Sequence, residues 1–149
     1  MLFNKNLLAC VSTVFMASTL VSAAAFPAVV RDSTSHLELM DFIMNTNATL
    51  TFTGAKPGSL AARAGGNVNV VYCTSRSGDV CGGSCTVYTG PATCISSPGT
   101  RCMKADFDVS FCDHGGCSGS CNQYNSCGTK LGNGFCDTPG TQSITVPFI

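Results

Sequence analysis

The sequence has 149 residues, and eight lysine and arginine residues balance eight aspartate and glutamate residues, so the formal net charge is zero. A chain without a cationic surplus or a basic cluster is not expected to bind nucleic acid or an anionic membrane surface. The densest mixed-charge stretch holds Arg101, Lys104, Asp106 and Asp108. We expect these four side chains to form a solvated face.

Residues 1–23 have the pattern of a secretory signal peptide. Lys5 lies near the start, an apolar segment follows over residues 7–20, and small side chains lead up to Ala23. The apolar segment is shorter than the about 20 residues that cross a bilayer; a buried core helix is the second interpretation. We expect cleavage after Ala23, secretion into the extracellular space and no membrane anchor. Cys10 would be removed with the signal peptide.

Residues 24–63 contain no cysteine and differ in composition from the rest of the chain. Ser35 and Glu38 form a capping-box pattern, and apolar residues then recur at helical spacing. This predicts a short amphipathic helix over about residues 36–45. Residues 49–53 alternate between threonine and apolar side chains, which predicts a strand.

Two positions in this segment are candidates for modification. Asn47 begins the tripeptide Asn-Ala-Thr, which is an acceptor for N-glycosylation if it is exposed. Arg63 is a single basic residue in a linker of small residues, just before the cysteine-rich part. It is either a cleavage site that releases residues 24–63 as a propeptide or an ordinary linker arginine, and the change in composition favours cleavage.

The other ten cysteines lie in residues 64–149. An even, dense set in a secreted chain predicts a framework of five disulfides, with the pairing left open. The domain needs such bridges, because its aliphatic and phenylalanine residues are too few for a stable core by themselves. The ten residues are Cys73, Cys81, Cys85, Cys94, Cys102, Cys112, Cys117, Cys121, Cys127 and Cys136.

The fold class expected for residues 64–149 is small, disulfide-rich and mainly β. Apolar and polar side chains alternate over residues 68–72, 107–111 and 144–148, and more weakly over 86–89, which predicts strands. Glycine, serine, asparagine and proline fill the stretches between them. We expect short antiparallel strands with long cystine-pinned loops, the first and last strands near each other, and little helix outside the propeptide.

The cysteine-rich domain lacks the residues that most enzyme sites need. It contains no glutamate, and its one histidine, His114, follows Asp113 in a glycine- and serine-rich stretch without a nucleophile motif. Paired cysteines leave no thiol nucleophile, and a secreted chain disfavours zinc ligation by the two C-x₃-C spacings. We therefore expect no catalytic residue, no cofactor and no metal site.

Three tyrosines have two interpretations. Their rings either present aromatic surface to a protein or sugar partner or pack against cystines inside the domain, and the second interpretation is favoured. The three residues are Tyr72, Tyr88 and Tyr124.

Several runs in the domain carry a family resemblance. They are VYCTSRSG at 71–78, CGGSCTVY at 81–88, VSFCDHGGC at 109–117, NGFC at 133–136 and TPGT at 138–141. Together these runs resemble small secreted cysteine-rich proteins of mushroom-forming basidiomycete fungi, over most of residues 67–149 and more loosely over the preceding helix and strand. In that family the propeptide tends to end in a basic processing site, the place that Arg63 occupies. The resemblance lends no catalytic residues and implies an effector-like role that faces a host or the environment.

The functional expectation is a secreted, effector-like interaction protein that acts without catalysis on an unknown extracellular protein or glycan. One alternative is a secreted defence protein, such as a protease inhibitor or an antimicrobial. Another is a structural component of the fungal wall or fruiting body. The sequence does not indicate an oligomeric state.

Overall fold

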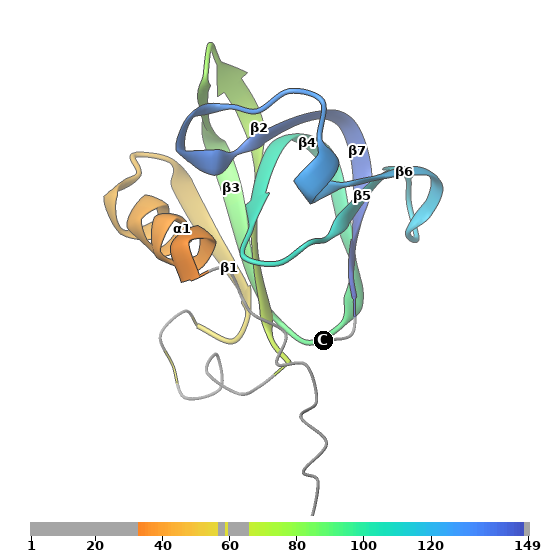
Figure 1. Cartoon of the computed structure of the whole chain (residues 1–149), viewed down its shortest axis with the longest axis horizontal. Coiled ribbons are helices and arrows are strands. Elements are labelled where there is room, and N and C mark those ends of the chain that lie inside the picture. Colours follow the sequence, from red (N-terminus) through yellow and green to blue (C-terminus); the bar gives the residue numbers. More distant parts are fainter. Residues whose placement is uncertain (1–32, 57–58, 60–65, 148–149) are drawn as a thin grey trace, which may run out of the picture.

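The computed structural model of the protein describes residues 33–56, 59 and 66–147. Within these ranges the chain forms a seven-stranded sheet, one α-helix and two short 3-10 helices (Figure 1). The predicted small, disulfide-rich, mainly β fold is confirmed. In chain order the elements are α1 (Ser33–Asn45), β1 (Thr49–Gly54), β2 (Val68–Ser77), β3 (Val80–Gly90), β4 (Thr93–Ala105), β5 (Ser110–His114), β6 (Ser118–Gln123), η1 (Tyr124–Ser126), η2 (Gly132–Gly134) and β7 (Cys136–Val146).

Some of the sequence predictions fall outside the described residues. These are the signal peptide, its cleavage position at Ala23, and Arg63. Within the described ranges, no helix is long and apolar enough to cross a membrane.

The strands follow the order β1-β3-β2-β4-β7-β5-β6 across the sheet. Among the described strands, β1 runs parallel to its neighbour β3, and the other pairings are antiparallel. β4 lies between β2 and β7, so the first and last strands of the cysteine-rich domain come close together, as expected. In Figure 1, α1 and β1 lie on one side of the molecule and β5 and β6 on the other.

The strands are longer than the sequence predicts. β3 continues through Gly83, and β4 runs for 13 residues through Pro98 and Gly99. Both glycines have positive φ angles, and they form irregularities inside strands because the backbone on either side still pairs with a neighbour. The strand predicted over residues 107–111 begins only at Ser110.

Two matching turns bend the ribbon formed by β4 and β7. Residues 97–100 read Ser-Pro-Gly-Thr and residues 138–141 read Thr-Pro-Gly-Thr. In each turn the final threonine hydroxyl donates to the carbonyl of the first residue at 2.8 Å. Thr100 pairs with Thr141, and the two Pro-Gly pairs bulge from opposite strands. The bend brings both halves of the ribbon against the same core.

Apolar clusters lie on both faces of the sheet. The inner cluster contains Val70, Met103 and Ile144, all fully buried, and draws on both halves of β4 and β7. The outer cluster contains Val71 together with Leu39 of α1. Val70 and Val71 are neighbours in the chain and serve different clusters because successive side chains of a strand point to opposite faces.

The ten cysteines of the domain form five disulfides, which confirms the predicted framework and settles its pairing. Two bridges join residues directly opposite each other on paired strands, β2 with β3 and β5 with β6. The other three connect β3 to β4, β4 to the β5–β6 turn, and the segment after η1 to β7. Five disulfides are typical of an extracellular protein. The pairs are Cys73–Cys85, Cys81–Cys102, Cys94–Cys117, Cys112–Cys121 and Cys127–Cys136.

Candidate binding groove

Helix α1 docks on the outer face of the sheet. Leu39 is fully buried in the outer cluster, and Phe42 packs edge-on against Phe135, with 4.7 Å between ring centroids. The predicted helix therefore exists, although it begins at Ser33, before the proposed cap at Ser35. A helix this short is marginal alone and is stabilised mainly by the apolar face that it buries.

A buried cation lies beneath this helix. The Lys104 side chain is 1% exposed, and its Nζ donates to Oε2 of Glu38 on α1 at 2.8 Å and to the carbonyl of Asn133 in η2 at 2.5 Å. An ammonium group inside a protein without such acceptors costs several kcal/mol. Lys104 therefore fixes α1 and η2 at defined positions on the sheet.

A buried carboxylate lies two residues further along the chain. Oδ1 of Asp106 accepts the main-chain N–H of Asn69 at 2.8 Å, and Oδ2 accepts Nδ2 of Asn69 at 2.6 Å. Nδ1 of His36 on α1 lies 3.0 Å from the same Oδ2 atom, and the Thr89 hydroxyl donates to Oδ1 of Asn69 at 2.6 Å. This network connects α1 to β2, to β3 and to the end of β4.

The prediction of a solvated mixed-charge face is wrong for Lys104 and Asp106. Both contact α1, and Lys104 has the same parity along β4 as Cys102, which belongs to the outer cluster that α1 covers. The alternation with a cysteine was the signal that sequence reasoning missed. Arg101, of opposite parity, remains exposed.

A groove of about 1030 Å³ lies between α1, the β2–β3 turn and η2. The helix contributes Asp41 and Asn45 to one wall, and Val80, with 69% of its surface exposed, begins β3 next to the turn on another. A second hollow of about 330 Å³ shares Asp41, Phe42 and Asn133 with the first and adds Leu37. The two hollows together follow the side of the helix.

The chemistry of the groove favours neutral or cationic ligands. Asp41 and Asp79 line the groove, Glu38 lines the second hollow and is paired with Lys104, and no lysine or arginine is found among the described lining residues of the two hollows. Asp41 also accepts a hydrogen bond from Nδ2 of Asn45 at 2.7 Å. Exposed Leu37 and Val80 supply apolar contact. An extended segment with amide or ammonium donors and small apolar side chains matches these groups.

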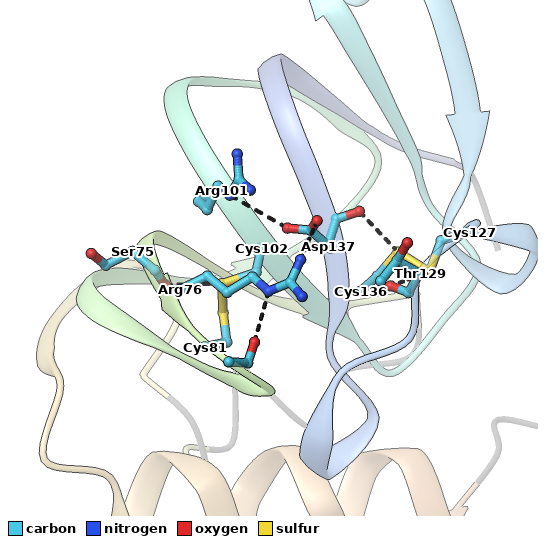
Figure 2. A network of polar contacts seen from close by, with 10 residues as sticks. Ser75, Arg76, Cys81, Arg101, Cys102, Cys127, Thr129, Cys136 and Asp137 are labelled. Atoms are coloured by element: carbon cyan, nitrogen blue, oxygen red, sulfur yellow. Dashed lines mark hydrogen bonds and ion pairs between the residues drawn. A yellow bond between two sulfur atoms is a disulfide. The ribbon is translucent and has the colours of Figure 1, made fainter.

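A polar network anchors the β2–β3 turn that forms one wall of the groove (Figure 2). Nε of Arg76 donates to the carbonyl of Gly78 in this turn at 2.8 Å, and Nη1 lies 2.5 Å from Oδ2 of Asp137 on β7. Nε of Arg101 on β4 lies 3.5 Å from the other carboxylate oxygen of Asp137. The Cys81–Cys102 disulfide adds a covalent link between β3 and β4. Side chains of β2, β4 and β7 therefore hold the turn in place.

The candidate glycosylation residue lies at this groove. Asn47 is exposed in the turn between α1 and β1, and it lines the larger hollow. Glycosylation of Asn47 remains a prediction that its exposure permits. A glycan there would lie beside the groove and would limit access from that end.

The histidine and the tyrosines considered in the sequence lie outside the groove. Nδ1 of His114 is 2.7 Å from Oδ1 of Asp113 at the exposed end of β5. This hydrogen bond, followed by one from the Ser120 main chain, holds the pKa of Asp113 below its usual value. Tyr72 and Tyr88 pack against the inner cluster, and Tyr124 is buried within it. Of the two interpretations of the tyrosines, packing inside the domain is therefore the one that the structure supports.

No protein-family model, curated protein or solved structure matches this chain. The groove is therefore interpreted from its own geometry and chemistry.

Proposed function

We propose that the protein is a secreted, effector-like interaction protein, which binds a segment of an extracellular or host protein in the groove beside α1 and acts without catalysis. The observation that carries the proposal is the groove itself, whose walls are fixed by the Lys104 ion pair on one side and by the Arg76–Asp137 pair on the other. A site with fixed walls loses little conformational entropy when a partner binds.

The lining residues favour a protein partner over a glycan. Val80 in the groove and Leu37 in the adjoining hollow are exposed large apolar residues, and such residues are a feature of protein interfaces. The aromatic rings in the groove are engaged with the protein itself, because Phe42 and Phe135 pack against each other and Phe135 is 1% exposed.

Two matched glycine substitutions test the groove. A Cβ atom at Gly82 meets no atom within 4 Å, so Gly82→Lys adds a long cationic side chain to the groove at little steric cost. Gly115 in the β5–β6 turn is equally open and outside the groove, so Gly115→Lys is a control with the same change of charge. The labelled proteins are applied to arrays of neutral and basic peptides and of extracellular glycans.

The proposal predicts that the wild-type protein and Gly115→Lys bind the same peptides, while Gly82→Lys binds them at least roughly tenfold more weakly, a change of about 1.4 kcal/mol. Equal binding by the two variants would show that the groove is not the site. Binding to glycans alone would replace the protein partner with a sugar. Stoichiometric inhibition across a panel of secreted proteases would favour the defence alternative, and retention in a fungal wall fraction would favour the structural one.

A further inference from the structure

We infer that residues 66–147 hold the segment 33–54 by a non-covalent docking surface, so that cleavage of the linker yields a two-chain protein and not a shed propeptide. The segment 33–54 comprises α1 and β1. Among the described residues all five disulfides lie between Cys73 and Cys136, so none ties this segment to the sheet.

The first component of the docking surface is apolar. Leu39 of the segment is fully buried in one cluster with Val71, Val87 and Phe135, each of which is at most 1% exposed. Loss of the segment would expose these side chains to water. The exposure of a contiguous apolar patch opposes dissociation.

The second component is a pair of buried charges. Lys104 and Asp106 are at most 2% exposed, and each meets a partner from α1, Glu38 for the lysine and His36 for the aspartate. Leu39 lies between the two contacts around the helix: His36, three residues earlier, is its neighbour on one side, and Glu38, one residue earlier, is about 100° away on the other. The surface therefore recognises charge as well as shape.

The third component is the edge of the sheet. All six residues of β1 pair with Ser84–Thr89 of β3, and the N–H of Ala55 donates to the carbonyl of Thr89 at 2.9 Å. Thr89 also belongs to the Asn69–Asp106 network that binds His36. The beginning of α1 and the end of β1 are thus both held near Thr89: α1 through the His36–Asp106–Asn69 contacts and β1 through the Ala55 hydrogen bond.

Retention of the segment does not depend on whether the groove binds a partner, although α1 takes part in both, since it forms one wall of the groove. A segment that stays bound keeps the groove intact after processing. The peptide-binding test uses the uncut protein, so a groove that binds nothing would leave the retention of the segment unaffected.

The test uses the full chain, with a specific protease recognition sequence placed in the linker at residues 57–65. The protein is folded, its disulfides are verified by mass spectrometry, and the linker is then cut without reductant. Size-exclusion chromatography at about 1 µM protein retains complexes whose Kd is well below that concentration. We expect the N-terminal fragment to co-elute with the domain and to separate in denaturant, which shows that no covalent link remains.

Two leucines on the same helix provide matched variants. Leu39→Asp places a carboxylate in the outer cluster, whereas Leu37→Asp changes a side chain that is 68% exposed. After cutting, Leu37→Asp should keep the fragment and Leu39→Asp should lose it. If Leu39→Asp does not fold, Glu38→Lys takes its place, because Glu38 has a side chain that is 50% exposed and the new cation would face Lys104.

The result that overturns the inference is release of the wild-type fragment from the cut protein at this concentration. Retention that is the same in Leu37→Asp, Leu39→Asp and Glu38→Lys would also overturn it, because the docking surface would then lie elsewhere.

Discussion

Leu39→Ala is the substitution that most directly measures how α1 is attached. Leu39 is fully buried in the outer cluster, and removal of a buried leucine side chain costs about 2.7–5 kcal/mol, depending on how far the cavity collapses. The cluster lies near the surface, where side chains around the cavity can partly fill it, so we expect about 3 kcal/mol, near the low end of that range. Among the described residues, the disulfides join residues of the sheet and its loops, so Leu39→Ala should destabilise α1 and β1 and not the whole domain.

Native-state hydrogen exchange distinguishes local destabilisation of α1 and β1 from destabilisation of the whole domain. The N–H of Thr46, which donates to the carbonyl of Phe42 at 2.9 Å, reports the opening of α1. A loss of about 3 kcal/mol should speed its exchange on the order of 100-fold. Amides of β2 and β4 that pair with each other should exchange as in the wild type.

Ile144→Ala is the matched control in the inner cluster. Ile144 is also fully buried, but it lies on β7 within the disulfide-linked sheet. This variant should speed exchange in the sheet and in α1 alike, because it lowers the stability of the whole domain. If Leu39→Ala gives that same uniform pattern, α1 and the sheet open as one unit and the reasoning about separate attachment is wrong.

Two further substitutions and two changes of solvent conditions test other contacts in the fold. Gly54→Ala should loosen β1 by about 1–3 kcal/mol, because Gly54 has a φ angle of 78° and a Cβ atom there would lie 2.2 Å from the Thr89 carbonyl oxygen; unchanged protection of Ala55 in hydrogen exchange would contradict this. Lys104→Met should cost about 1–2 kcal/mol in denaturant unfolding, a modest loss because Glu38 is half exposed, and a cost above about 4 kcal/mol would disagree. Burial raises the pKa of Tyr124 to about 12, so its stabilising effect is complete below pH 10 and is lost as the pH rises through 12; a tyrosinate absorbance titration in which all three tyrosines ionise near pH 10 would refute it. Reduction should unfold the domain, since each disulfide contributes about 2–4 kcal/mol, and a circular dichroism spectrum that stays native in strong reductant would show that the core suffices.

Sequence patterns predicted the helix and those strands in which apolar residues recur at a regular spacing. The alternation over residues 68–72 lies within β2, that over 144–148 begins in β7, and the capping-box region lies within α1. The glycine-rich run at 81–85 and the Ser-Pro-Gly-Thr run at 97–100 are typical of loops in sequence, yet both lie within long strands. Strand pairing on both sides stabilises such a backbone more than its own residues favour it, and this pairing is a non-local property.

The candidate site was harder to predict than the fold. Asn47 was found from its tripeptide, and it lies at the groove. Lys104 and Asp106 were missed, because a charged residue in a strand is expected to face solvent unless a covering element is known. The element that covers them is α1, which lies more than sixty residues earlier in the chain.

The sequence by itself determined that this is a disulfide-stabilised, mainly β protein with a helix and a strand before its first paired cysteine. Those features follow from residue counts and short-range periodicity, which act within a few residues. The tertiary structure alone decided which cysteines pair, that β1 joins the sheet while α1 packs on its face, and that two charges are buried beneath the helix. These depend on contacts between residues far apart in the chain, where burial and pairing outweigh local preference.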